Sequence, residues 1–510
     1  MRPSIVFLAV VIALLLGHLS TRFLTPLRPT EGVSEQQTKQ RLISTHFTLD
    51  ISRIDAPFLQ DSTGGALARL GDRLLLMTGG GEFHILRADR SGFDRLDIPP
   101  PLDHAEAQAL FIRPKDKNAT GAERLVVRRS GDGWELFVSH TKAYPDRNCI
   151  TLAVSRLGLR AEGESLAVSQ PWRMIYETAP CLSTPEAFPL QSGGMLAFAA
   201  DGRLILGSGD HGYDDFNRTD PRIRTGELDN DYGKVIAIDP DTGTGTILAS
   251  GLRNSSGLTV DDRGRIWEVE HGPRGGDELN LIEPGANYGW PSVTYGVHYG
   301  THSWPLSRTQ GRHPGFRKPV YAWVPSIAIS SLIQVGGSTF PEWRGDLIVG
   351  SLRGRQLVRL RIGEGPRVIV AEPMKIGVRV RALAQLASGE IAVLADEQPV
   401  VLILRPLAGG GTQDQLPGEL AACAECHSFR PDSADGDIPT LWAVWQRNIA
   451  SLPGTNYSTG LKAVPGRWDR AALAAYLAAP GSFAPGTAMP SPGLGSEDID
   501  AVLDALEILN

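Results

Sequence analysis

The sequence predicts an all-β propeller followed by a small all-α domain. Three observations support this fold class. Hairpin patterns recur between residues 60 and 400, a Gly-rich polar stretch follows them, and the composition beyond it shifts to Ala and Leu at helical spacing. A chain of 510 residues is also too long for one compact core, so more than one domain is expected.

Each hairpin pattern consists of an alternating apolar strand, a tight turn that holds Gly or Asp, and a second strand. Clear examples span residues 64–81, 193–210, 256–272 and 380–397. Their recurrence favours a propeller, because no unit of the size of a β-sandwich is visible. The long insertions 211–231 and 285–325 are expected to form loops on one face, where binding sites are usually built.

A change of composition marks the end of the predicted propeller. Residues 406–415 include three consecutive glycines with polar neighbours, which is typical of a flexible linker. The strand patterns before it assign residues 42–405 to the propeller. Amphipathic Ala/Leu segments after it assign residues 416–510 to a helical domain of the size of one small unit.

Residues 1–25 have the pattern of a targeting segment. Arg2 precedes an unbroken apolar run from Ile5 to Leu16, which indicates a secretory signal peptide or a short N-terminal anchor. The run is shorter than the apolar stretch of about 20 residues that a helix needs to span a membrane. No clear cleavage site follows it, so both alternatives stay open. Either one predicts an exported protein, periplasmic or anchored to the inner membrane.

The charge of the chain excludes one class of function. The formal net charge is −7 and no Lys/Arg-rich run is present, whereas nucleic-acid binding requires a basic surface. Two cysteines, Cys149 and Cys181, lie far from the other two. In an oxidising compartment we expect them to pair. Two free buried thiols are the alternative, because the sequence gives no distance between them.

Near the end of the chain, Cys423, Cys426 and His427 form a C-x-x-C-H motif. This spacing is typical of a covalent c-type haem, with both thiols on one turn of helix and the histidine as an axial iron ligand. A zinc or redox dithiol site is the weaker alternative, because the chain has no second C-x-x-C pair. Met489, beside Pro490 in a predicted loop, is either a second iron ligand or a packed core residue.

The segment around Met489, together with the C-x-x-C-H motif, resembles class I cytochromes c. The resemblance covers the whole predicted helical domain. It implies a covalent haem c with His/Met ligation, which raises the reduction potential and suits electron transfer.

Two motifs in the predicted propeller carry a second resemblance. GLRNSSGL at 251–258 and EHGPRGGDELNLIEPGANYGWP at 270–291 resemble the glucose/sorbosone dehydrogenase family, six-bladed propellers that use pyrroloquinoline quinone (PQQ). Segments 325–332 and 340–354 are also similar to that family. The resemblance covers residues 185–400 well and the first blades poorly. It implies the oxidation of an aldose or a similar sugar alcohol or hemiacetal.

The resemblance also implies a cationic cofactor site. PQQ carries three carboxylates and an o-quinone, and arginine suits such a ligand because its planar fork binds carboxylates in bidentate fashion. Arg253 and Asn254 match the family positions that contact the quinone. Arg353, Arg379 and Arg381 match its carboxylate-binding positions, although ordinary surface charge is the alternative for any one of them.

A Ca²⁺ ion lies against the quinone in this family and is held partly by backbone carbonyls. Gly272 and Pro273 occupy the matching positions here. A cation bound there would act as a Lewis acid and polarise a quinone oxygen.

The sequence departs from the family at the position of the catalytic base. The family carries a histidine just before the hairpin that begins at residue 193, and the matching residue here is Gln191. Glutamine forms hydrogen bonds but does not act as a base near neutral pH. Three explanations are open. His211 or Asp210 serves instead, although a histidine in such a turn is more often structural; Arg253 and Ca²⁺ support a slower reaction on another substrate; or the propeller has lost dehydrogenase activity.

Taken together, the two parts predict an exported PQQ-dependent aldose dehydrogenase that passes electrons to its own haem and then to a respiratory acceptor. The rival prediction is a catalytically inactive propeller that binds a ligand or docks the cytochrome. Gln191 favours the rival. The retained Arg253, Arg379 and Arg381 favour the enzyme, because an inactive propeller needs no carboxylate-binding cluster.

Overall fold

In the computed structural model of this chain, the described residues are 40–60, 64–101, 104–111, 121–163, 165–184, 189–215, 218–219, 224–300, 312–407, 418–424, 426–429, 438–453 and 455–508. The predicted signal or anchor segment and residues 408–415 of the predicted linker lie outside these ranges. None of the described helices combines the length and the apolar character needed to cross a membrane.

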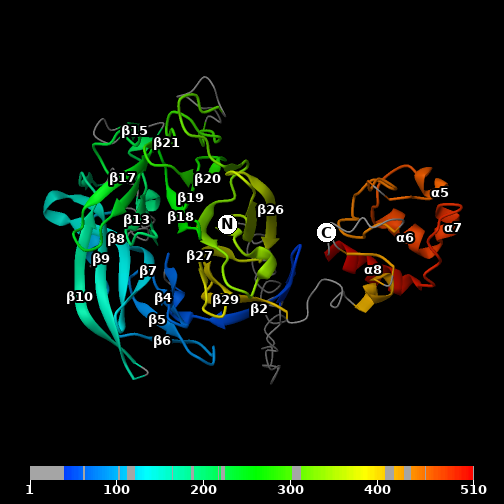
Figure 1. The fold of residues 1–510 in the computed structure, drawn as a ribbon, viewed down its shortest axis with the longest axis horizontal. Coiled ribbons are helices and arrows are strands. Elements are labelled where there is room, and N and C mark those ends of the chain that lie inside the picture. Colours follow the sequence, from blue (N-terminus) through cyan, green and yellow to red (C-terminus); the bar gives the residue numbers. More distant parts are fainter. Residues whose placement is uncertain are drawn as a thin grey trace, which may run out of the picture. The chain divides into compact units, whose positions relative to one another are not determined.

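Six of the seven described sheets are the blades of an all-β propeller, which follow one another around a centre in chain order (Figure 1). Blade 1 contains β3 (Ala66–Leu70), β4 (Arg73–Met77), β5 (Phe83–Leu86) and β6 (Phe93–Arg95). Blade 2 contains β7 (Ala122–Ser130), β8 (Gly133–Tyr144), β9 (Cys149–Glu162) and β10 (Ser165–Glu177), with β11 (Leu182–Ser183) paired to β9. Blade 3 contains β12 (Gly193–Phe198), β13 (Leu204–Ser208), β16 (Val235–Ile238), β17 (Gly245–Ser250) and β21 (Ala286–Asn287).

The remaining blades follow the same plan. Blade 4 contains β18 (Ser255–Val260), β19 (Ile266–Glu270), β20 (Asp277–Ile282) and β22 (Tyr321–Trp323). Blade 5 contains β23 (Ile329–Gln334), β24 (Leu347–Ser351), β25 (Gln356–Ile362) and β26 (Val368–Lys375). Blade 6 contains β27 (Arg379–Gln385), β28 (Ile391–Asp396), β29 (Val400–Pro406), β2 (Thr48–Asp55) and β1 (Gln40–Ile43).

The innermost strands β3, β7, β12, β18, β23 and β27 contact one another in a closed ring. Blade 6 is completed by β2, which pairs antiparallel with β29, so strands from both ends of the propeller sequence close the ring. The hairpins expected at 64–81, 193–210, 256–272 and 380–397 are confirmed, and each supplies the innermost and second strands of one blade.

Apolar residues on both faces of the second strands explain why blades stack. Leu74, Leu75 and Leu76 of β4 are consecutive, and each is at most 1% exposed. Leu74 and Leu76 pack in the core that blade 1 shares with blade 6, whereas Leu75 packs in the core that it shares with blade 2. A strand buried on both faces needs apolar side chains at successive positions, and the sequence supplies them here.

The expected pairing of Cys149 and Cys181 is confirmed as a disulfide. It joins the start of β9 to the residue before β11, across 32 positions of sequence. The backbone continues the same link, because Ser183 of β11 pairs with Cys149.

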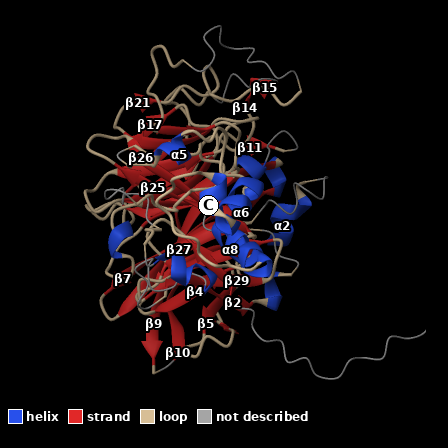
Figure 2. Ribbon diagram, turned by 90° about the vertical axis from the view of Figure 1, so that its right-hand side faces the viewer, coloured by secondary structure: helices blue, strands red, loops and turns tan. Residues whose placement is uncertain are grey.

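The C-terminal part is helical and has a hydrophobic core that includes Leu473, Tyr476 and Leu503. Its helices are α4 (Ala421–Ala424), α5 (Thr459–Lys462), α6 (Arg470–Ala478), α7 (Pro480–Phe483) and α8 (Ser496–Ile508). Figure 2 distinguishes these helices from the strands of the propeller. Asp469 caps α6 by accepting a hydrogen bond from the backbone N–H of Ala472 at 2.8 Å.

Short elements complete the described structure. They are η1 (Pro57–Leu59), α2 (His104–Ala109), η2 (Pro145–Arg147), η3 (Pro189–Gln191), β14 (Asp214–Asp215), β15 (Arg218–Thr219), η4 (Pro341–Trp343) and η5 (Gly418–Leu420).

Candidate functional site

The innermost strands begin, and the second strands end, at one end of the propeller, which we call the strand-start end. Antiparallel pairing causes this arrangement. Ser255 at the start of β18 pairs with Glu270 at the end of β19, and Arg379 at the start of β27 pairs with Asp396 at the end of β28. The residues expected to form the cofactor site flank these strand ends: Gln191, Arg253, Asn254, Gly272, Pro273, Arg353, Arg379 and Arg381.

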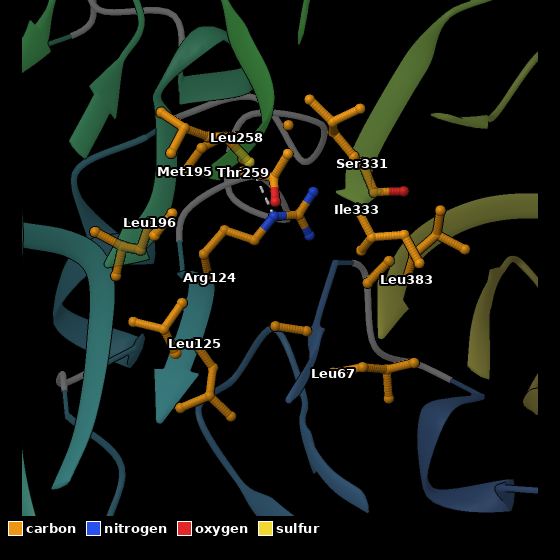
Figure 3. Close-up of a pocket in the computed structure, with 16 residues that line it drawn as sticks. Leu67, Arg124, Leu125, Met195, Leu196, Leu258, Thr259, Ser331, Ile333 and Leu383 are labelled. Carbon is orange, nitrogen blue, oxygen red and sulfur yellow. Dashed lines mark hydrogen bonds between the residues drawn. The ribbon is translucent and has the colours of Figure 1, made fainter. Parts of the chain in front are cut away.

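One arginine links all six blades at this end. Arg124 is the third residue of β7, and its guanidinium points into the centre of the ring (Figure 3). It donates to the carbonyls of Gly65, Ser256, Ser330 and Arg381 and to the sulfur of Met195. These partners lie within or just before the innermost strands of the other five blades. Burial lowers the pKa of Arg124 to about 10, and the charge of Arg381 acts in the same direction.

A cavity of about 240 Å³ occupies the channel beyond Arg124. Leu125, Leu196, Leu258 and Leu383 contribute to its lining, and Figure 3 shows them around Arg124. The four residues whose carbonyls accept from Arg124 each directly precede a lining residue of the cavity in their strand. The guanidinium therefore closes the cavity on the side of the strand-start end.

The amide of Gln191 bridges Asp210 and Arg253. In the orientation that satisfies its neighbours, its nitrogen donates to Oδ1 of Asp210 at 2.8 Å and its oxygen accepts from Nη2 of Arg253 at 3.2 Å. Asp210 also accepts from the backbone N–H of Gly212 at 2.9 Å and from the indole N–H of Trp290 at 2.8 Å. Trp290 belongs to the insertion 285–325, so this insertion does reach the site, as expected.

Arg253 is held in place by its own backbone and by two carbonyls. Its Nη1 donates to the carbonyls of His271 at 3.0 Å and Gly272 at 3.2 Å, and its guanidinium lies 5.2 Å from the ring centre of Trp290. Its backbone N–H donates to Glu270 at 2.5 Å. Its buried Nε has no hydrogen-bond partner among the described residues. A buried, unpaired donor is costly, so this atom fits an acceptor atom of a bound anion.

The loop after β19 is the expected calcium position. A side chain at Gly272 would lie 2.3 Å from the carbonyls of Gly275 and Gly276, so only glycine fits there. Its backbone N–H donates to Asp277 at 3.1 Å, and its carbonyl faces Arg253. Within the described ranges, no three His, Cys, Asp or Glu side chains converge as a metal cluster. A cation bound here would therefore depend on backbone carbonyls such as those of Gly272 and Pro273.

Arg379 and Arg381 share one carboxylate. Nε of Arg379 lies 3.2 Å from Asp396, while Nε and Nη2 of Arg381 lie 3.0 and 2.9 Å from it. Their side chains remain 28% and 29% exposed, so both guanidinium groups still have faces open to a ligand. Arg353, two residues beyond β24, is exposed, and its side chain pairs with none of the described residues. The three cationic positions thus gather on blades 5 and 6.

The geometry of His211 favours a structural role over that of a base. It has a positive φ of 50°, and its backbone N–H donates to the carbonyl of Gln191 at 3.1 Å. Its ring packs edge-on against Tyr232, with 5.5 Å between ring centres. Burial lowers its pKa to about 3. A histidine this reluctant to take a proton is a weak proton acceptor near neutral pH.

Glu123 and Arg124 were not expected at the site from the sequence, because they lie outside the segment that resembles the family well. Their signal is two successive charged residues directly before the apolar run Leu125, Val126 and Val127. Glu123 lies against blade 3, where a side chain at Gly194 would come within 2.7 Å of its Cβ. Burial raises the pKa of Glu123 to about 7, although Ser192, Arg124 and Arg381 all favour its ionised form.

The haem motif lies at the end of α4. Cys423 is half-buried, Cys426 is exposed, and both thiols are free. α4 ends at Ala424, and the backbone continues in a turn, because the N–H groups of Cys426 and His427 donate to the Cys423 carbonyl at 3.3 and 2.8 Å. The bond from His427 spans four residues, as in an α-helix, so Cys423 and Cys426 lie on one turn. Nδ1 of His427 lies 2.8 Å from the carbonyl of Pro439, which orients the ring and leaves Nε2 for iron.

Met489 lies in the loop between α7 and α8. Its backbone N–H donates to the hydroxyl of Thr487 at 3.3 Å, and that hydroxyl lies 2.6 Å from the hydroxyl of Tyr476 on α6. The side chain of Met489 packs partly buried against the helical core. The loop is thus tied to α6, and the side chain fits either an iron ligand or a core residue.

A family model for glucose/sorbosone dehydrogenase matches residues 127–404. The chain belongs to this family. It is 34% identical over 259 residues to an uncharacterised protein of Synechocystis sp., covering 46% of this chain and 59% of that one. It is 27% identical over 264 residues to the aldose sugar dehydrogenase of Escherichia coli, covering 48% of this chain and 67% of that one.

The propeller also matches a solved glucose dehydrogenase, with a TM-score of 0.57 and 26% identity over 70% of this chain and 99% of that one. The helical part matches a cytochrome c homologue of Rickettsia bellii, with 40% identity over 82 residues, or 16% of this chain and 47% of that protein. This chain therefore joins a glucose/sorbosone dehydrogenase propeller to a cytochrome c domain.

Proposed function

We propose that this protein oxidises an aldose, or a similar sugar alcohol or hemiacetal, with bound PQQ and passes the electrons to its own c-type haem. The observation that carries the proposal is the arginine-rich strand-start end of a propeller in this family, in one chain with a C-x-x-C-H motif. The names of the Escherichia coli relative and of the solved glucose dehydrogenase support a sugar as the substrate.

The residues present fit an anionic quinone. Arg253 offers a buried Nε that lacks a partner among the described residues, and Asn254 follows it in the chain. Arg353, Arg379 and Arg381 would hold the carboxylates, with Asp396 keeping two of these guanidinium groups oriented. Bound PQQ would supply an o-quinone able to accept a hydride.

Around that position, the chain supplies orientation and charge. Gln191 and Asp210 hold Arg253 on one side, and the carbonyls of His271 and Gly272 hold it on the other. A fixed positive charge at a buried site stabilises negative charge that develops on a neighbouring oxygen. Ca²⁺ held by the carbonyls of Gly272 and Pro273 would add Lewis-acid polarisation to the same region.

In the helical part, Cys423 and Cys426 would attach the haem, and His427 and Met489 would ligate its iron. The haem would accept the electrons singly and give them to a respiratory acceptor. We also propose that the protein is exported, periplasmic or held at the inner membrane by residues 1–25. The disulfide of Cys149 and Cys181 supports this, because such bonds persist in oxidising compartments.

An inactive propeller that binds a ligand or docks the cytochrome is the second candidate. Gln191 favours it, because a glutamine stands where the family carries its base. The two candidates differ in one observable: only the enzyme reduces its own haem when it is given a sugar.

The test uses the full-length protein with its haem attached. PQQ and Ca²⁺ are titrated in, a panel of aldoses is added, and haem absorbance is followed. We expect haem reduction that depends on PQQ. Arg253→Gln should abolish it and leave the haem spectrum unchanged, whereas the matched change of an exposed arginine, Arg263→Gln, should have no effect. PQQ binding without haem reduction by any aldose would support the inactive propeller.

A further inference from the structure

A buried carboxylate at the strand-start end takes no part in the contacts of the proposed cofactor site. Glu123 is the second residue of β7, between Ala122 and the central Arg124. One of its carboxylate oxygens, Oε1, is buried and has no hydrogen-bond partner among the described residues. Such an oxygen is costly in a protein interior unless something binds it.

Glu123 adjoins the segment from which the base is missing. Ser192, which directly follows Gln191, lies beside the carboxylate. Gly194 of β12 approaches the Glu123 side chain so closely that a Cβ there would lie 2.7 Å from one carbon and 3.0 Å from the next. The carboxylate also lies near enough to Arg381, one of the expected carboxylate-binding residues, to be influenced by its charge.

We propose that Glu123 accepts the proton that leaves the substrate hydroxyl, in place of the histidine that this sequence lacks at position 191. This inference rests on the proposed function. In the step, the O–H bond of the alcohol or hemiacetal breaks and its proton goes to the Glu123 carboxylate. The adjacent C–H bond breaks, and its hydrogen would leave with the bonding electron pair as hydride to a bound o-quinone. A C=O bond forms, which gives a lactone when the substrate is a cyclic hemiacetal.

Two other carboxylates near this end, Asp210 and Glu270, are less suited. Asp210 already accepts from Gln191, Gly212 and Trp290. Glu270 accepts from the backbone of Arg253 and from the amide of Asn280.

Two histidines near this end are also weak proton acceptors, because burial lowers the pKa of His211 to about 3 and that of His271 to about 4. Glu123 is thus the carboxylate with a free oxygen next to the Gln191 segment.

The charges around Glu123 set when it is ionised. Burial raises its pKa to about 7, while Ser192, Arg124 and Arg381 oppose that rise. The neighbouring strand β8 contributes His140, whose ring nitrogens contact the Thr141 carbonyl and the Ser155 hydroxyl. Burial lowers the pKa of His140 to about 4, so it stays neutral. An acceptor that is half ionised near neutral pH suits proton transfer there.

The first test is the pH profile of sugar-dependent haem reduction in full-length protein with PQQ and Ca²⁺. Because the ionised form is the active one, kcat/KM should rise with pH through about 7 and then level off. Glu123→Gln should lower kcat by about 100-fold or more and abolish that rise. Glu123→Asp should keep part of the activity and the rise. The matched change at an exposed site, Glu162→Gln, should alter neither.

A second readout does not depend on catalysis. The pKa of Glu123 is raised from 4.5 to about 7 on folding, so its contribution to stability is lost as pH rises through that window. The Glu123→Gln variant has no such titrating group, so it does not lose this stability. Without PQQ and Ca²⁺, the difference in melting temperature between Glu123→Gln and the wild type should therefore shift in favour of the variant from pH 5 to pH 8. The same difference for Glu162→Gln should stay constant.

The outcomes separate the two proposals. If wild-type protein reduces no haem with any aldose, the proposed function fails and Glu123 has no reaction to serve. If the wild type is active and Glu123→Gln keeps its rate and its pH profile, only the role of Glu123 is overturned. Three results together support the proposal. Glu123→Gln loses its rate of haem reduction, Glu123→Asp keeps the rise of kcat/KM with pH, and the melting temperature of Glu123→Gln changes with pH as described.

Discussion

At the scale of single residues, the amide of Gln191 has a task that few side chains could perform. It donates to Asp210 and accepts from Arg253 at the same time. A carboxamide does both without carrying charge. Gln191 is therefore an ordered part of the site. Under the proposed function, the proton acceptor is sought among its neighbours, which is where Glu123 lies.

Replacing Gln191 with histidine gives a direct prediction. One imidazole nitrogen would donate to Asp210, and the other would have to accept from Arg253, so its basic lone pair would be occupied. We expect Gln191→His to change kcat/KM of sugar-dependent haem reduction by less than about threefold. The exposed Gln170→His serves as control. A gain of about 100-fold would mean that the base was missing and that Glu123 does not supply it.

At the scale of secondary-structure elements, the six innermost strands depend on one shared side chain. Arg124 reaches the carbonyls of four blades and the sulfur of Met195 on a fifth, and it is itself carried by β7. Each innermost strand is hydrogen-bonded to a neighbouring strand along one edge only, and its other edge faces the channel. The backbone carbonyls at the start of that edge therefore need hydrogen-bond donors from the channel. A guanidinium, with five N–H groups in a plane, is suited to this position.

Arg124→Met tests this link, because methionine keeps the apolar stem and removes the donors. We expect the free energy of unfolding of the propeller to fall by on the order of 3 kcal/mol, since several carbonyls lose a charged donor. Denaturant unfolding followed by circular dichroism measures it. Arg129→Met, on the same strand but exposed, should cost less than about 1 kcal/mol. Equal effects of the two changes would contradict a central role for Arg124.

At the scale of the whole molecule, the chain carries a propeller of the glucose/sorbosone dehydrogenase family and a cytochrome c domain in one polypeptide. Under the proposed function, joining donor and acceptor covalently would make electron transfer between them intramolecular. Its rate would then depend on an effective concentration set by the connecting segment and not on the amount of protein. The expected linker at residues 406–415 is where this length would be adjusted.

Dilution tests the intramolecular transfer. We expect the rate constant of haem reduction by substrate to stay unchanged when the protein is diluted about tenfold. As control, a haem-free variant, Cys423→Ser with Cys426→Ser, is mixed with an Arg253→Gln variant that keeps its haem. In this mixture donor and acceptor are on separate chains, so the rate should fall with dilution. A rate that falls equally in the intact protein would indicate transfer between molecules.

The sequence by itself determined the features that depend on local spacing. Alternating strands around tight turns gave the hairpins of blades 1, 3, 4 and 6, because side-chain periodicity reports which faces are buried. Helical spacing gave α6 and α8. Nearness in sequence likewise placed Cys423, Cys426 and His427 together on one turn.

Only the tertiary structure decided which distant residues share the strand-start end. Glu123 and Ser192 are 69 positions apart, and Arg124 and Arg381 are 257 apart. They meet because antiparallel pairing returns every second strand to the same end and because β2 closes the ring on β29. The sequence also left the pairing of Arg379 and Arg381 with Asp396 unseen. Local patterns carry no information on such contacts, since the contacts exist only once the ring has closed.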